Sequence, residues 1–183
     1  TGWTFGAVPA IAYDADLGFK YGAVVNLYEY GDGSTYPEYR HSIYLEWSRT
    51  TKGSGINMFT YDSKYLIPGI RVSANISYLT EQALDFYGFN GFESLYRNEF
   101  ETEDDPDYLS RLWYRMDRKQ FLGQIELMGG ITDELKWYGS YAYNNFDLDT
   151  VDLDRLNKGR DADDLLPSVG GGLYGRYIDW GIM

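Results

Sequence analysis

The side chains best suited to catalysis are scarce in this sequence, which contains a single histidine, His41, and no cysteine. A hydrolase of the Ser-His-acid type would have to use His41 as its general base. Without cysteine there is no thiolate ligand or thiol nucleophile, and a zinc site would have to be completed by carboxylates. No GxSxG, Walker or dinucleotide-binding pattern occurs in the sequence. We therefore expect neither an enzyme nor a cofactor, and interpret His41 as a polar residue at the start of a strand.

Two acidic stretches are the other candidates for chemistry, because clustered carboxylates can hold a divalent cation. The stretch 98–107 carries six carboxylates, and the stretch 147–164 carries seven aspartates. Like charges in such runs usually remain in water, which predicts two solvated loops. Calcium binding is the alternative, although neither run has the EF-hand spacing with its central Gly and terminal Glu. We assign no metal ligand.

The elements that position these groups are indicated by the stretch IRVSANISY, residues 70–78, in which apolar and polar residues alternate without exception. A period of two predicts a β-strand with two unlike faces. In a soluble sandwich the apolar face would meet a protein core, whereas in a membrane barrel it would meet lipid and the polar face would line the lumen. The apolar, lipid-facing candidates are Ile70, Val72, Ala74, Ile76 and Tyr78; the polar, lumen-facing candidates are Arg71, Ser73, Asn75 and Ser77.

The same period recurs along the chain and predicts an all-β fold. We expect eight strands, over residues 3–13, 19–30, 40–50, 55–66, 70–85, 111–130, 135–146 and 172–183. No apolar run approaches the roughly 18 to 20 residues of a membrane-spanning helix. We therefore do not expect a helical membrane protein, whereas a transmembrane barrel is not detected by this criterion because its strands are short and half apolar.

The composition limits the kinds of partner that this chain is expected to bind. The net charge of −12 argues against nucleic acid, whose binding draws on clustered Lys and Arg. The 19 Tyr and 5 Trp suit positions that are apolar at one end and wet at the other, as at a bilayer interface. Carbohydrate-binding β proteins are rich in the same residues, so a sugar ligand stays open.

The connections between the predicted strands differ in length at the two ends. The two long ones, about 86–110 and 147–171, share an end with the short turns 14–18 and 51–55. The opposite end carries 31–39, 67–69 and 132–134. Outer-membrane barrels have long external loops and short periplasmic turns. We therefore predict an antiparallel up-and-down transmembrane β-barrel whose acidic loops 86–110 and 147–171 are external.

The first hairpin, FGAVPAIAYDADLGFKYGA (residues 5–23), resembles the opening hairpin of BamA/TamA-family outer-membrane barrels of the surface-antigen type. DFYGFNGFES (residues 85–94) is similar to a second stretch of that family, with Asn90 and Gly91 in reversed order. The matching positions are Pro9, Tyr13, Asp14, Asp16, Gly18 and Gly22 in the first stretch, and Phe86, Tyr87, Gly88 and Asn90 in the second.

The resemblance implies a sixteen-stranded barrel of which this chain supplies the N-terminal half, so that residues 1–183 form one incomplete barrel domain. The chain ends YIDWGIM, without a terminal aromatic residue, and it lacks the family's Arg-Gly-Phe/Tyr loop motif. The resemblance also implies a lateral seam at the first strand, with Phe5, Gly6, Pro9 and Tyr13 as its residues. Pro9 has no N–H to donate, so it fits a seam or a bulge better than a central strand.

The function expected from these features is that of a barrel in the bacterial outer membrane, acting in outer-membrane protein assembly, transport or as a membrane scaffold. Its partners would be outer-membrane lipids and lipopolysaccharide, with other outer-membrane or lipoprotein subunits as candidates, and no nucleic acid. No periplasmic domain precedes Thr1 in this sequence, so insertase activity is not carried over. Two alternatives stay open: a small eight-stranded structural or adhesion barrel, and a secreted carbohydrate-binding β-sandwich.

Overall fold

The computed structural model describes residues 2–89, 92 and 95–166 of the 183-residue chain. Strands dominate this part, whose two helices have four residues each: η1 (Asn98–Glu101) and α1 (Leu153–Leu156). The strands are β1 (Trp3–Pro9), β2 (Ala12–Asp14), β3 (Gly18–Glu29), β4 (His41–Thr50), β5 (Gly55–Ile67), β6 (Ile70–Asp85), β7 (Arg115–Gly130) and β8 (Lys136–Asp149). The predicted all-β class is confirmed.

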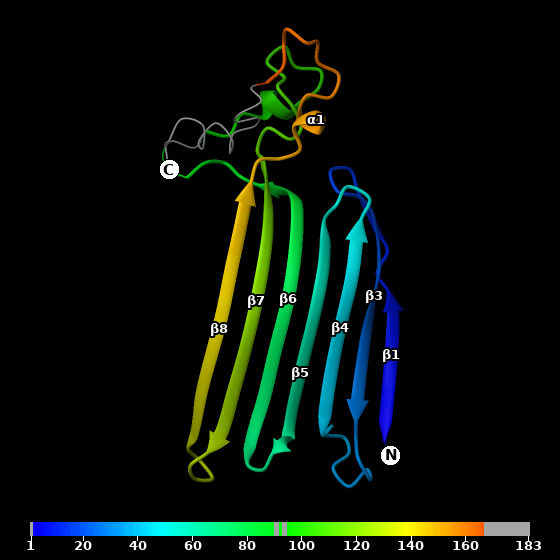
Figure 1. Ribbon diagram of the computed structural model, residues 1–183, viewed down its shortest axis with the longest axis vertical. Coiled ribbons are helices and arrows are strands. Elements are labelled where there is room, and N and C mark those ends of the chain that lie inside the picture. The colour runs from blue at the N-terminus through cyan, green and yellow to red at the C-terminus, as the bar shows by residue number, and fades with distance from the viewer. Residues whose placement is uncertain (1, 90–91, 93–94, 167–183) are drawn as a thin grey trace. The chain divides into compact units, whose positions relative to one another are not determined.

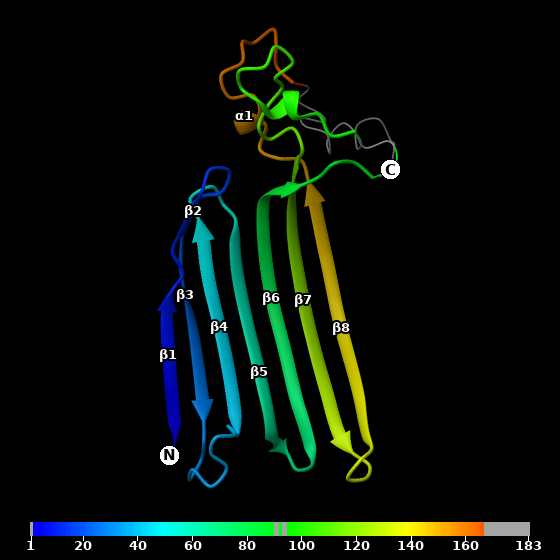
Figure 2. The ribbon, with the colours of Figure 1, turned by 180° about the vertical axis from the view of Figure 1, so that it is seen from behind.

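All eight strands belong to one antiparallel sheet in the order β1-β3-β4-β5-β6-β7-β8, with β2 paired to β3 beside β1. From β3 onward, each strand therefore pairs with the strand that precedes it in the chain, as Figure 1 and, from behind, Figure 2 show. This is the predicted up-and-down order. Within the described residues the sheet is open, with β1 at one edge and β8 at the other.

Seven of the predicted strands are found, with one interruption and two changed ends. The first predicted strand is interrupted between β1, which ends at Pro9, and β2, because proline cannot donate to the ladder. β7 begins at Arg115 rather than at residue 111, since residues 112–114 are buried in a turn. β8 continues to Asp149. The eighth predicted strand, 172–183, lies outside the described residues.

The pairing register places apolar and polar residues on opposite faces of the sheet. One row across five strands consists of Ala7, Val25, Leu45, Phe59 and Ile76. The adjacent row consists of Asn26, Tyr44, Thr60 and Asn75, whose side chains point to the other side because successive residues of a strand alternate. We call these sides the apolar face and the polar face. The alternation read from the sequence is thus kept across the sheet.

Contacts divide the chain into two compact units, residues 1–80 with 120–146, and residues 81–119 with 147–183. We call the described parts the sheet unit and the loop unit. All the strands of the sheet unit lie in the one sheet. The loop unit instead has a small hydrophobic core of Leu112, Val151 and Leu156, against which Ala83, Leu153 and Leu166 pack.

The two acidic connections therefore form a packed unit of their own rather than separate solvated loops. Their carboxylates remain largely exposed, while the apolar residues between them supply the core. Helices in the part of the chain that the structure describes are too short and too polar to cross a membrane.

Candidate functional site

The apolar face of the sheet is a large surface that nothing in the sheet unit covers. Phe5 is 78% exposed, Ile76 is 51% exposed and Tyr141 is 70% exposed. The largest apolar patch on a typical soluble monomer measures a few hundred Å². Exposed aromatic or aliphatic residues occur on most strands of the apolar face, which indicates a surface that binds something apolar. Its exposed members include Phe5, Tyr21, Leu45, Trp47, Ile76, Tyr78, Phe121, Ile125, Trp137, Tyr141 and Tyr143.

Aromatic residues mark both ends of this face. At the end with the turn 51–54, the Tyr21 and Trp47 rings meet edge to face at 6.0 Å, and Tyr78 lies two strands further along the same row as Trp47. At the opposite end His41 and Tyr61 stack at 6.0 Å, and the His41 Nδ1 lies 2.7 Å from the Tyr61 hydroxyl. These contacts suit the interpretation of His41 as a polar residue at a strand start.

On the polar face, the carboxylate of Asp62 is the centre of a hydrogen-bonded network. Arg71 donates to it through Nε at 2.8 Å and Nη2 at 3.1 Å, and the Ser73 hydroxyl donates at 2.6 Å. The Tyr39 hydroxyl, from the connection between β3 and β4, donates at 2.9 Å. With so many donors Asp62 is held as a structural anion rather than left open for proton transfer.

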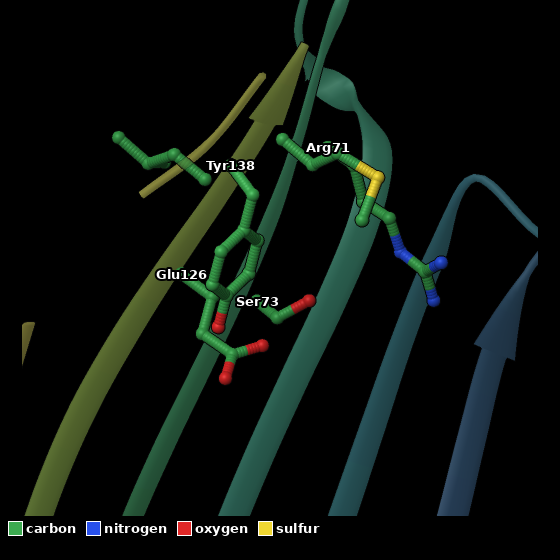
Figure 3. A pocket seen from close by; sticks show the side chains of 6 residues that line it. Arg71, Ser73, Glu126 and Tyr138 are labelled. Carbon is green, nitrogen blue, oxygen red and sulfur yellow. The ribbon is translucent and has the colours of Figure 1, made fainter. Parts of the chain in front are cut away.

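A second polar group lies next to this network. Two adjoining hollows of about 190 and 200 Å³ share Ser73 and Glu126 in their walls. Figure 3 shows the Tyr138 hydroxyl and the Glu126 carboxylate pointing into the same hollow, while the Ser73 hydroxyl, which donates to Asp62, and the Arg71 guanidinium point to the other side. Glu126 accepts a hydrogen bond from the Gln124 amide at 2.7 Å. Both hollows are smaller than the 300 Å³ or more of typical ligand pockets, so this face suits contact with water better than capture of a substrate.

Each residue predicted on the two faces of β6 lies on its expected side, with two differences in exposure. Ser77 is on the polar face but is 4% exposed, because it lies opposite Met58 in the register. Val72 is on the apolar face but is 6% exposed, opposite Ser63 where the pairing of β5 shifts. The alternation in the sequence predicts the face of the sheet on which each side chain lies, whereas the exposed fraction of that side chain depends on its neighbours in the sheet.

The glycines of the first hairpin have a structural reason. Gly18 has a φ of +79°, a conformation that favours glycine, and a side chain there would meet the Thr51 hydroxyl. At Gly22 an added Cβ would collide with the Trp47 carbonyl oxygen and would lie 2.6 Å from Ser48 Cα. Both glycines therefore let β3 approach the strand and turn beside it closely.

The predicted seam residues lie along the open edge of the sheet. Phe5, Gly6 and Pro9 belong to β1, with Pro9 opposite Ala23, and Tyr13 belongs to β2. In the break between β1 and β2, the Ala10 N–H donates to the Gly22 carbonyl at 3.0 Å. The edge of the sheet therefore remains hydrogen-bonded to β3 there.

The residues of the second family-like stretch lie in the loop unit. Phe86 is buried, Gly88 has a φ of +109°, and the Tyr87 ring contacts Tyr96 and Tyr114 at 5.6 Å each. Asn90 lies outside the described residues. These side chains contribute to packing among aromatic rings, a role that sequence spacing alone did not reveal.

Asp117 is the most unusual titratable group of the loop unit. Its Oδ1 atom is buried and accepts no hydrogen bond from the described residues. The pKa of Asp117 is raised to about 6, mainly by burial and also by the charges of Asp149 and Asp152, while Arg155 and Lys119 act in the opposite direction. Sequence reasoning missed Asp117, because it stands alone between basic residues rather than in an acidic run.

We expect the packing of the loop unit to weaken as the pH rises through about 6. Because the pKa in the folded protein lies above the ordinary value of 3.8, the neutral carboxyl stabilises the fold at low pH, and this contribution is lost between about pH 4 and 6. Asp117→Asn should stabilise the unit at pH 7.5 by on the order of 1 kcal/mol, a value reduced because the group is half exposed. Hydrogen exchange at the Leu156 and Asn157 amides, corrected for intrinsic rates, measures this.

Asp163→Asn is the matched control, since it removes the same charge at an exposed site of the same unit. It should leave the exchange rates unchanged at pH 7.5 and also at about pH 4, where the carboxyl of Asp117 is neutral. Equal effects of the two substitutions would contradict the assignment of the pH dependence to Asp117.

No group of three or more metal-ligating side chains comes together among residues 2–89, 92 and 95–166. The acidic runs thus show no calcium site in that part of the chain. Compared with family models, with curated proteins and with solved structures, the chain matches none of them. The likeness to the BamA/TamA family accordingly stays a prediction based on the two sequence stretches.

Proposed function

We propose that this protein is a transmembrane β-barrel protein of the bacterial outer membrane that acts in outer-membrane protein assembly, in transport or as a membrane scaffold. The observation that carries the proposal is the apolar face, which is exposed across the sheet and lies opposite a hydrogen-bonded polar face. A lipid-facing surface needs no second protein layer, and a water-filled lumen suits the charged network around Asp62.

The lengths of the strands support the same proposal. A membrane-crossing strand needs about 9 to 11 residues when tilted. The parts of β6, β7 and β8 that belong to the sheet unit are residues 70–80, 120–130 and 136–146, eleven residues each. β4 has 10 residues. In the proposed barrel these segments cross the membrane, and Asp117 lies outside them.

The distance between the two aromatic ends of the apolar face also fits the thickness of a membrane. Tyr21 marks one end of the apolar face on β3, and Glu29, which pairs with Trp3, marks the other. Eight residues of a strand cover about 27 Å along its axis. A tilt of about 40° would bring the height to about 20 Å, close to the band of about 25 Å between the aromatic girdles of outer-membrane barrels.

The choice of assembly or transport within this class rests on the resemblance of residues 5–23 and 85–94. Gly18 and Gly22 of the first stretch leave no room for a Cβ, so the matching glycines have a structural role in this hairpin. In the proposed barrel β1 is the seam strand, and its interruption after Pro9 would weaken pairing there.

The proposal is tested by folding the full chain in plain buffer, in detergent micelles and in phospholipid vesicles. We expect aggregation in buffer and a β-type circular dichroism spectrum in detergent and lipid, with residues 120–146 protected from trypsin in vesicles. A monodisperse, folded protein in plain buffer would contradict membrane insertion.

Of the two alternatives, the small eight-stranded barrel shares the apolar face and would pass the same test. The carbohydrate-binding sandwich requires a second sheet packed about 10 Å from the first. All strands of the described residues belong to one sheet, which favours the membrane proteins over the sandwich.

A further inference from the structure

Arg49 is a charged residue on the apolar face. It follows Leu45 and Trp47 at alternate positions of β4, and in the register it lies between Tyr21 and Gly55. A guanidinium exposed to hydrocarbon at the bilayer midplane is unfavourable, but this cost becomes small near the membrane surface. Since Arg49 comes just before the turn 51–54, it lies at the end of the strand, where the apolar face would reach the headgroups.

The guanidinium of Arg49 is held in place but is not neutralised. It donates to the carbonyls of Ser48 at 2.8 Å and Ile56 at 3.3 Å, and to Oδ1 of Asn57 at 2.7 Å. Among the described residues no carboxylate lies within ion-pair distance of it, whereas Arg71 on the polar face is paired with Asp62. These bonds use three of the five guanidinium N–H groups, so two remain to bind an anion.

The surroundings of Arg49 keep this geometry. Its guanidinium carbon lies 5.4 Å from the centre of the Trp47 ring, which in turn contacts Tyr21. On β5 the residue opposite Arg49 is Gly55, which has no side chain, and a Cβ there would come within 2.8 Å of Arg49 Cδ. The missing side chain lets the guanidinium lie across β5, beside two aromatic rings of the kind found at bilayer interfaces.

We propose that Arg49, with Trp47 and Tyr21, forms a binding site for the phosphate of an anionic lipid headgroup at the rim of the sheet. The site rests on the proposed membrane function, because it needs the apolar face to be in lipid. An arginine with two free N–H groups can bind phosphate oxygens in a bidentate manner, and the aromatic rings position the headgroup beside it.

The test uses the full chain in nanodiscs of phosphatidylcholine with a minor share of phosphatidylglycerol, followed by native mass spectrometry of the retained lipids. The wild type should retain phosphatidylglycerol above its share of the bilayer, and Arg49→Gln should reduce this enrichment roughly fivefold, the value of one basic residue at a membrane surface. Arg49→Lys should retain part of it. Lys20→Gln, which removes the same charge from the polar face beside Glu46, should have no effect.

Two further measurements separate the possible failures. High salt should lower the enrichment of the wild type, which requires no variant to fold. At equal ionic strength, inorganic phosphate should lower the enrichment no more than sodium chloride does, because the ligand is a lipid; a larger loss with phosphate would overturn the proposal. A wild type that enters nanodiscs without enriching phosphatidylglycerol overturns the lipid site alone. A chain that does not enter pure phosphatidylcholine nanodiscs contradicts the membrane function itself.

Discussion

Ile76→Arg is expected to lower the free energy of unfolding in lipid by on the order of 2 to 4 kcal/mol, the cost of an arginine at the bilayer midplane. Ile76 lies in the central row of the apolar face with Phe59 and Leu45, near the middle of the segment 70–80. Its side chain is 51% exposed, so the arginine would meet the surrounding medium rather than a protein core. Urea unfolding in phospholipid vesicles, followed by tryptophan fluorescence, measures the change.

Gln124→Arg is the control on the opposite face. Gln124 lies beside Glu126 and lines the same polar hollow, so an arginine there gains a carboxylate partner and remains in contact with water. We expect it to change stability by less than about 0.5 kcal/mol, as for an ordinary surface substitution. Equal costs for the two substitutions would mean that both faces meet the same medium, which contradicts a membrane sheet.

Gly22→Ala is expected to destabilise the sheet by about 3 kcal/mol, the upper end of the cost of overpacking. The new methyl group would meet the carbonyl oxygen of Trp47 and Cα of Ser48. These are backbone atoms, which do not move aside as the end of a side chain can. The pairing of β3 with β4 would have to open, and the midpoint of urea unfolding in detergent should fall accordingly.

Gly6→Ala provides the matched control in the neighbouring strand. Gly6 lies in β1, and a Cβ there would meet no atom within 4 Å. The substitution should be neutral or stabilise the protein by up to about 1 kcal/mol, because alanine has less freedom in the unfolded chain. A loss of stability at Gly6 as large as that at Gly22 would show that close approach is not the reason for the glycine.

Local patterns were sufficient to predict most of the sheet. The alternation of residues 70–78 identified β6, and the order of short and long connections gave the up-and-down topology. Both depend on neighbours in the chain, because a strand with two unlike faces must alternate with period two. The break after Pro9 follows from the missing N–H, whereas one continuous strand over residues 3–13 was predicted.

Contacts between distant residues were not predictable in the same way. Tyr39 and Asp62 are 23 positions apart, and their hydrogen bond depends on how the connection between β3 and β4 folds back. Arg49 reads in the sequence as an ordinary surface charge near a turn. Only the register, which places Gly55 opposite it and Trp47 beside it, distinguishes it from the paired arginine at position 71.

The sequence by itself determined that the chain forms antiparallel strands with one apolar and one polar face, because side-chain direction along a strand is a local property. The tertiary structure decided which of those side chains are exposed, paired or buried. It joined two acidic connections around Leu112, Val151 and Leu156, and it buried the carboxyl of Asp117 beside Arg155. Burial and charge pairing depend on segments that are far apart in the chain, so they arise only when the fold brings those segments together.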